Sequence, residues 1–157
     1  DYFQNKTDFK DFSSLEISNS IKKIRKIIIN NKNLHTINKT INHFRLKDFF
    51  NDKIKEKEYV IKRIQNLENN STIISNNDDV FFELEIKNVL KRKNINFIES
   101  KYFDVKDVFW EMMKYEKIIS NGSTIAFWAG IIGGRELKIE LINLKNFYSF
   151  LINLKSK

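Results

Sequence analysis

Gly133 and Gly134 are adjacent, follow an apolar segment, and constrain the possible folds more than any other feature of the sequence. A two-residue connection made of glycines can take positive φ at both positions, as the primed turns of β-hairpins require. After the pair, charged and apolar residues alternate from Glu136 to Leu141. This alternation is typical of a strand with one buried and one wet face. The sequence therefore predicts a hairpin over residues 124–142.

Most of the remaining chain has apolar residues at helical spacing. We expect helices over residues 18–31, 34–44, 46–70, 80–94, 105–119 and 144–157, and a short β-like segment over residues 95–103. Residues 70–79 are polar and rich in turn formers, which predicts a boundary between a basic helical unit (1–75) and a second unit (76–157). The two units can also form one continuous domain. The predicted fold class is α+β, dominated by helices, with a C-terminal hairpin.

Two more specific architectures agree with this order of elements. A helix, an extended link, a second helix and a hairpin follow one another in a winged helix. An internal repeat is the other possibility, because "HFRLKDFF" (43–50) is similar to "YFDVKDVF" (102–109) and "NNSTI" (69–73) to "NGSTI" (121–125). The chain would then contain two related helical units.

The composition limits what the charge can indicate. Ile, Asn and Lys occur 24, 20 and 23 times, 67 of 157 residues in total, and A/T-rich codons encode them. An AT-rich genome therefore explains part of the net charge of +8. The absence of cysteine excludes disulfides, thiol nucleophiles and thiolate metal sites. No apolar run approaches the roughly 20 residues of a membrane span, and an intracellular protein is favoured.

The charge and the aromatic residues still suggest binding surfaces. Residues 1–77 hold 15 basic and 9 acidic groups, net +6. Clustered cations can contact the phosphates of nucleic acids, and the candidates for such contacts are Lys22, Lys23, Arg25, Lys26, Lys91, Arg92, Lys93 and Arg135. Large aromatic side chains contribute most to protein interfaces, and the candidates are Phe109, Trp110 and Trp128.

The sequence contains no complete catalytic motif. His35 and His43 are eight residues apart without neighbouring ligands, which indicates surface or interface positions. Glu136-Leu137-Lys138 matches the strand of PD-(D/E)xK-like nucleases, in which a carboxylate pair holds Mg²⁺ and Glu83 or Glu85 could assist. However, the preceding predicted strand offers no carboxylate. No glycine-rich phosphate loop is present. We expect no catalytic residue, metal or cofactor, and small-molecule binding is not favoured.

These observations predict a non-catalytic binding module. The favoured role is a protein-interacting component of a larger assembly, with a basic face that can also touch a nucleic-acid backbone. A winged-helix DNA-binding protein and a PD-(D/E)xK-like metal-dependent nuclease are the alternatives.

Overall fold

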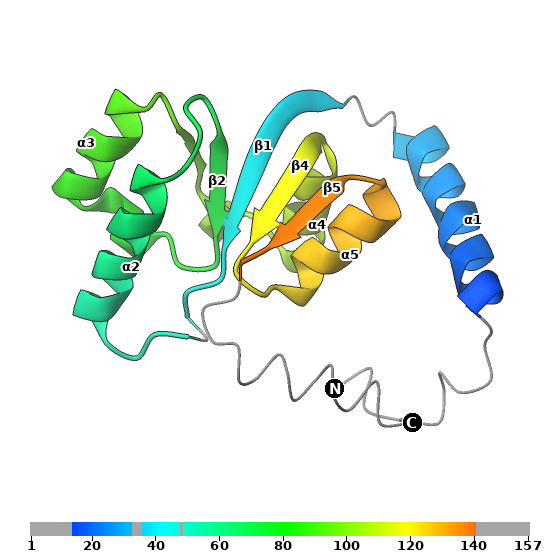
Figure 1. Cartoon of the computed structure of the whole chain (residues 1–157), viewed down its shortest axis with the longest axis horizontal. Coiled ribbons are helices and arrows are strands. Elements are labelled where there is room, and N and C mark those ends of the chain that lie inside the picture. Colours follow the sequence, from blue (N-terminus) through cyan, green and yellow to red (C-terminus); the bar gives the residue numbers. More distant parts are fainter. Residues whose placement is uncertain (1–13, 33–35, 48, 141–157) are drawn as a thin grey trace.

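The computed structural model describes residues 14–32, 36–47 and 49–140, and within them five parallel strands form one sheet (Figure 1). The strand order is β3-β2-β1-β4-β5. The strands are β1 (Ile37–Phe44), β2 (Thr72–Ser75), β3 (Asn96–Ile98), β4 (Tyr115–Ser120) and β5 (Glu136–Ile139). The helices are α1 (Ser14–Lys32), α2 (Lys53–Gln65), α3 (Leu84–Arg92), α4 (Val105–Met113) and α5 (Thr124–Gly133), with 3₁₀ turns η1 (Asp79–Phe82) and η2 (Ser100–Tyr102). The predicted α+β class is therefore wrong, because this is an α/β fold.

Helices cover both faces of the sheet. The chain adds β2 and β3 on one side of β1, then returns past β1 to add β4 and β5 on the other side. Helices α2 and α3 pack on one face with a first core cluster, and α4 and α5 pack on the other face with a second cluster. This is the doubly wound arrangement, in which right-handed crossovers place the helices of the two halves on opposite faces.

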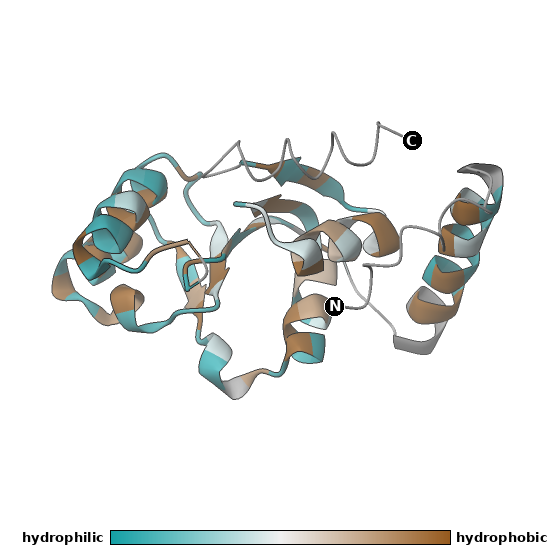
Figure 2. Ribbon diagram, turned by 90° about the horizontal axis from the view of Figure 1, so that it is seen from below, coloured by the Kyte–Doolittle hydropathy of each residue, from teal (hydrophilic) through white to brown (hydrophobic). Residues whose placement is uncertain are grey.

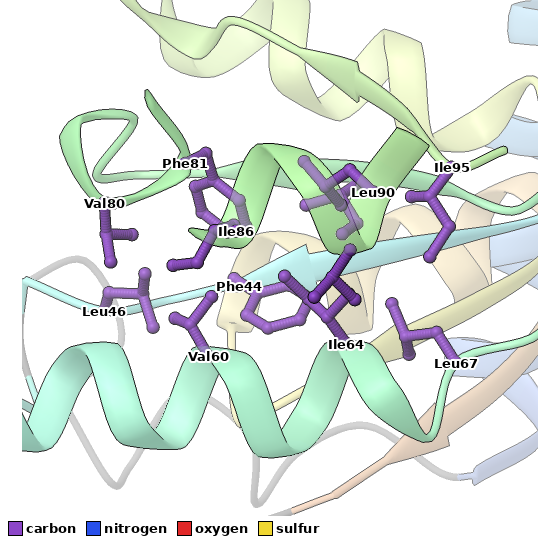
Figure 3. Packing of buried hydrophobic residues seen from close by; sticks show 12 residues of the cluster. Phe44, Leu46, Val60, Ile64, Leu67, Val80, Phe81, Ile86, Leu90 and Ile95 are labelled. Carbon is purple, nitrogen blue, oxygen red and sulfur yellow. The ribbon is translucent and has the colours of Figure 1, made fainter. Parts of the chain in front are cut away.

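The first cluster is centred on Phe44, the last residue of β1 (Figure 3). Phe44 is fully buried, and its ring meets the ring of Phe81 edge-on at a centroid distance of 5.6 Å. Val60 and Ile64 from α2 reach it from below in Figure 3, and α3 closes the cluster from above. The end of the central strand is thereby fixed by packing.

The predicted hairpin is a β–α–β unit instead. Residues 124–133 form α5, whose N-cap Ser123 accepts a hydrogen bond from Ala126 N. The buried face of this helix consists of small residues, which are Ala126, Ala129, Gly130 and Gly133. An apolar run of this length fits a buried helix as well as a strand, and the serine cap and the small residues favour the helix. A winged helix is excluded with the hairpin.

The glycine pair ends this helix and does not form a hairpin turn. Gly134 has φ of 65°, the left-handed conformation that closes many helices and favours glycine. A Cβ atom at this position would lie 2.9 Å from Arg25 Cζ. The alternation that follows is real, but β5 pairs with β4 in a parallel register and not an antiparallel one.

Two predicted helices contain strands. Residues 37–44 form β1, and the predicted helix over 105–119 ends at Met113, after which β4 begins. Ile37 and Ile41 lie four apart, which satisfies both the helical spacing and the period of two for a strand. Central strands of a parallel sheet are buried on both faces, so they lack the polar alternation that identifies amphipathic strands. The periodicity was therefore ambiguous.

Other expectations have mixed outcomes. Helix α3 and strand β3 lie within the predicted segments, whereas α2 begins at Lys53 behind its N-cap Asp52 and α1 begins at Ser14, before the serines predicted to cap it. The internal repeat is wrong, because "STI" of residues 71–73 enters β2 whereas "STI" of 123–125 begins α5. Ser75, at the predicted boundary, is the last residue of β2. The predicted helix over 144–157 lies outside the described residues.

Candidate functional site

The carboxyl ends of β1 and β4 lie side by side where the direction of strand addition reverses. From β1 the chain turns to α2 on one face, and from β4 it turns to α5 on the other (Figure 1). In open α/β sheets, the loops that diverge at such a switch point leave a crevice, and ligands bind there. The side chains at this edge therefore define the candidate site.

Asn121 connects the two loops. Its Oδ1 accepts a hydrogen bond from Arg45 N at 2.7 Å, and its Nδ2 donates to Arg45 O at 2.9 Å. From the other neighbouring strand, Asn76 Oδ1 accepts from Leu46 N at 2.7 Å. Asn121 itself has no exposed surface. The backbone after β1 is held from both sides, which gives Arg45 a fixed starting point.

Two serines and a histidine lie beneath this connection. Ser120 Oγ accepts a hydrogen bond from Ser123 N at 3.2 Å and lies 3.5 Å from His43 Nδ1. Ser120 Oγ has one proton to donate and a second lone pair that can accept, so it can form this contact with either tautomer of the neutral ring. Burial, followed by the positive charges of Arg45 and Arg63, lowers the pKa of His43 to about 4. The imidazole is neutral at physiological pH.

The N-terminus of helix α5 lies at this edge, and some of its backbone N–H groups have no hydrogen-bond acceptor. Ser123 provides acceptors for two of the N–H groups at this end, since its Oγ accepts from Ala126 N and its carbonyl oxygen accepts from Phe127 N at 3.0 Å. Within the described part of the chain, the N–H groups of Thr124 and Ile125 have no acceptor. Free amides and the helix dipole together favour an anion at such an end.

The predicted nucleic-acid contacts do not form one surface. Lys22, Lys23 and Lys26 are exposed on α1, and Lys91 and Arg92 are exposed at the end of α3. The remaining three cap the C-terminal carbonyl groups of helices, which is a stabilising position for cations. Arg25 binds Ile131 O and Ile132 O of α5, Lys93 binds Gln65 O and Leu67 O at the end of α2, and Arg135 binds Met113 O of α4.

The predicted interface aromatics are half-buried. Phe109 and Trp110 pack edge-on at 5.3 Å and lie against the second core cluster. Trp128 packs in the same way against Phe127, at 5.4 Å, and the Phe127 side chain is the more exposed of the two. These rings contribute to the fold of α4 and α5, and only part of each is open to a partner.

The residues proposed for a nuclease site do not come together in the structure. Glu136 pairs with Lys117 at 2.9 Å, and Lys138 pairs with Glu140 at 2.7 Å. Glu83 and Glu85 both pair with Lys57 of α2. Across residues 14–32, 36–47 and 49–140, no three potential metal ligands form a cluster.

Two shallow hollows of about 410 and 460 Å³ lie at the opposite edge, around the amino ends of the strands. Some polar groups of their walls are paired, as in the Lys117–Glu136 ion pair and the hydrogen bond from Thr40 to Glu68, whereas the buried Ser71 Oγ of the second hollow has no hydrogen-bond partner among the described residues. Neither hollow is lined by a residue of the switch-point edge.

The sequence analysis missed the residues that define this site. His43 was interpreted as a helix-surface or interface residue, and "NGSTI" (121–125) was interpreted as part of a repeat and as the start of the hairpin. A signal was available, because an apolar segment that ends in Ser-Asn-Gly-Ser and continues as a second apolar segment is typical of a strand that turns into a capped helix.

Comparisons with protein-family models and with curated proteins find no match for this chain. In the described part, no helix combines the length and the apolar character needed to cross a membrane. The fold and the site define an open, doubly wound parallel α/β domain with polar side chains at its switch point.

Proposed function

We propose that this protein binds a phosphate-bearing small molecule of the nucleotide type at the carboxyl ends of β1 and β4. The observation that carries the proposal is the pair of unused amide donors, Thr124 N and Ile125 N, at the topological switch point. This proposal replaces the expectation that small-molecule binding is not favoured. Arg45 follows β1 at this edge, its positive charge acts on His43, and its backbone is bound by Asn121.

The buried polar residues support this function by preorganising the donors. Ser120 and Ser123 hold the turn before α5, and Asn121 links that turn to the loop after β1. A ligand that meets donors already in place loses less free energy to ordering on binding. The neutral ring of His43 keeps a second positive charge out of the core beneath the site.

A proline substitution tests the proposal at one donor. Thr124→Pro removes the N–H of the first helical residue, where proline is well tolerated, together with the exposed Thr124 hydroxyl, and Ser123 already has the extended backbone that precedes a proline. One charge-assisted hydrogen bond contributes roughly 1.5–3 kcal/mol, so we expect affinity to fall about 10- to 100-fold. Calorimetric titration with pyrophosphate and with ADP, GDP and UDP measures the change.

Val105→Pro is the matched control. Val105 is the first residue of α4, it is exposed, and Asp104 before it also has an extended backbone. This variant keeps wild-type affinity if the α5 donors bind the ligand. Equal affinity of Thr124→Pro and wild type, or no binding of any of the four compounds, would remove the proposal.

A second proposal retains the predicted protein partner and places it on α1. Ile24 and Ile27 are 44% and 59% exposed. Exposed Lys22, Lys23 and Lys26 surround them, and Figure 2 shows hydrophobic and hydrophilic residues mixed along this helix, at the far right. An apolar centre with a basic rim fits a protein partner with an acidic rim.

For α1, the expected result is that Ile27→Glu releases a protein retained by the wild type from a native extract. Leu84→Glu is the control, because Leu84 is 75% exposed on the distant α3, and it should retain the same protein. Retention of nucleic acid instead, lost with rising salt and with Lys23→Glu, would decide for nucleic acid and against a protein partner.

A further inference from the structure

Arg63 is a buried cation that uses only part of its hydrogen-bonding capacity. It belongs to α2, is 7% exposed, and donates through Nη1 to the Tyr59 hydroxyl at 2.6 Å. Its Nε and Nη2 are buried and have no hydrogen-bond acceptor. A buried charged group without acceptors is costly, and buried polar groups in folded proteins are rarely left in this state. The unused donors therefore need an explanation.

The two unused nitrogens lie on the same edge of the guanidinium plane. Nε–H and Nη2–H together form the fork that binds two oxygens of a carboxylate or phosphate. The plane is held in place, since Arg63 Cζ lies 4.6 Å from the centroid of the Phe44 ring and Tyr59 binds the other end. Such a fork is prepared for an oxyanion.

The nearest described carboxylate does not satisfy this fork. Glu140 Oε2 is 3.6 Å from Arg63 Nη2, which is within reach of an ion pair but too long for a hydrogen bond. Its other oxygen is bound by Lys138 at 2.7 Å. The Glu140 side chain is 40% exposed, so it can turn into solvent. Two cations and one anion leave a net charge of +1.

We propose that the Nε–Nη2 edge of Arg63 binds an oxyanion, either a phosphate or a carboxylate group, in the place now next to Glu140. Phe44 and His43 are consecutive in β1, so Arg63 over the Phe44 ring lies on the sheet face opposite to His43. This site is distinct from the amides of α5 and does not depend on the function proposed for them. Lys138 supplies a second positive charge when Glu140 moves aside.

Nuclear magnetic resonance on the whole ¹⁵N-labelled protein tests the site directly. The Arg63 Nε–Hε signal, assigned by its loss in Arg63→Lys, should shift and saturate during titration with inorganic phosphate and with acetate. Glu140→Gln removes the competing charge and should bind phosphate several-fold more tightly. Glu136→Gln, at the start of β5 and paired with Lys117, should leave the affinity unchanged. If Arg63→Lys does not fold, assignment through the backbone of the wild type replaces it.

The outcomes separate the two sites and the two sources of the anion. An Arg63 signal that does not move with either anion overturns this inference, even if the Thr124 amide responds to pyrophosphate and the proposed function stands. A response of Arg63 without one at Thr124 supports the inference and contradicts the proposed function. If ADP moves the Arg63 signal in wild type but not in Thr124→Pro, the anion belongs to a ligand that spans both sites; free phosphate would act in both proteins.

Discussion

Phe44→Ala should lower the free energy of unfolding by about 3–5 kcal/mol, the range for removing a buried aromatic side chain. Phe44 is completely buried and contacts the rings of Phe81 and Tyr59 and the guanidinium of Arg63. Domains of this size are stable by about 5–15 kcal/mol, so a large part of the total would be lost. Urea denaturation followed by circular dichroism measures the change.

Phe82→Ala is the comparison for this result. Phe82 lies one residue after Phe81 but is 37% exposed, so its removal should cost about 1 kcal/mol. The urea dependence of the free energy should be the same in both variants, because neither alters the surface exposed on unfolding by much. Equal losses in the two variants would mean that the first cluster is not centred on Phe44.

The second large effect is a loss of stability in acid that depends on His43. Its pKa falls from 6.5 in the unfolded chain to about 4 in the folded protein, because burial and two arginines disfavour the charged ring. Between these values the unfolded chain binds a proton that the folded protein does not. This contribution is therefore complete above pH 6.5 and falls by about 3 kcal/mol as the pH decreases to 4.

The variant His43→Asn isolates this contribution. The asparagine side chain carries both a hydrogen-bond acceptor and a donor for Ser120 Oγ, and it has no charge to gain. Carboxylates affect both proteins alike, so the difference in unfolding free energy between wild type and variant should shrink or change sign from pH 7.5 to 4. A difference that stays constant over this range would contradict a buried, neutral His43.

Local elements were predicted correctly from the sequence where only one interpretation of the pattern was possible. Helix α3 has a polar face and an apolar stripe, and β3 is short and bounded by turn formers, so both were found. The pattern failed for the central strands β1 and β4 and for the buried helix α5, because elements surrounded by apolar neighbours lose their polar alternation. The glycine pair was identified as a special backbone position, but the left-handed end of a helix was mistaken for a turn.

The site was harder to predict than the fold, for a related reason. The site has two parts, His43 with Arg45 and Ser120–Ser123, which are separated by about 75 residues in the sequence. Only the pairing of β1 with β4 brings these two parts together. Assigning β1 as a helix removed that pairing. Among the basic residues, composition could not separate the lysines in solvent from Arg25, Lys93 and Arg135, which bind helix carbonyls.

The position of β1 in the middle of the sheet has a consequence for how the protein forms. One neighbour of β1 is β2, which follows it closely in the sequence, but the other neighbour is β4. The hydrogen bonds of β1 to β4 can therefore form only after a much later segment has been synthesised. Until then, a nascent chain carries an open strand edge next to Ile41, which other chains could join. Closing such a long loop is slow, and chaperone protection during synthesis would benefit this fold.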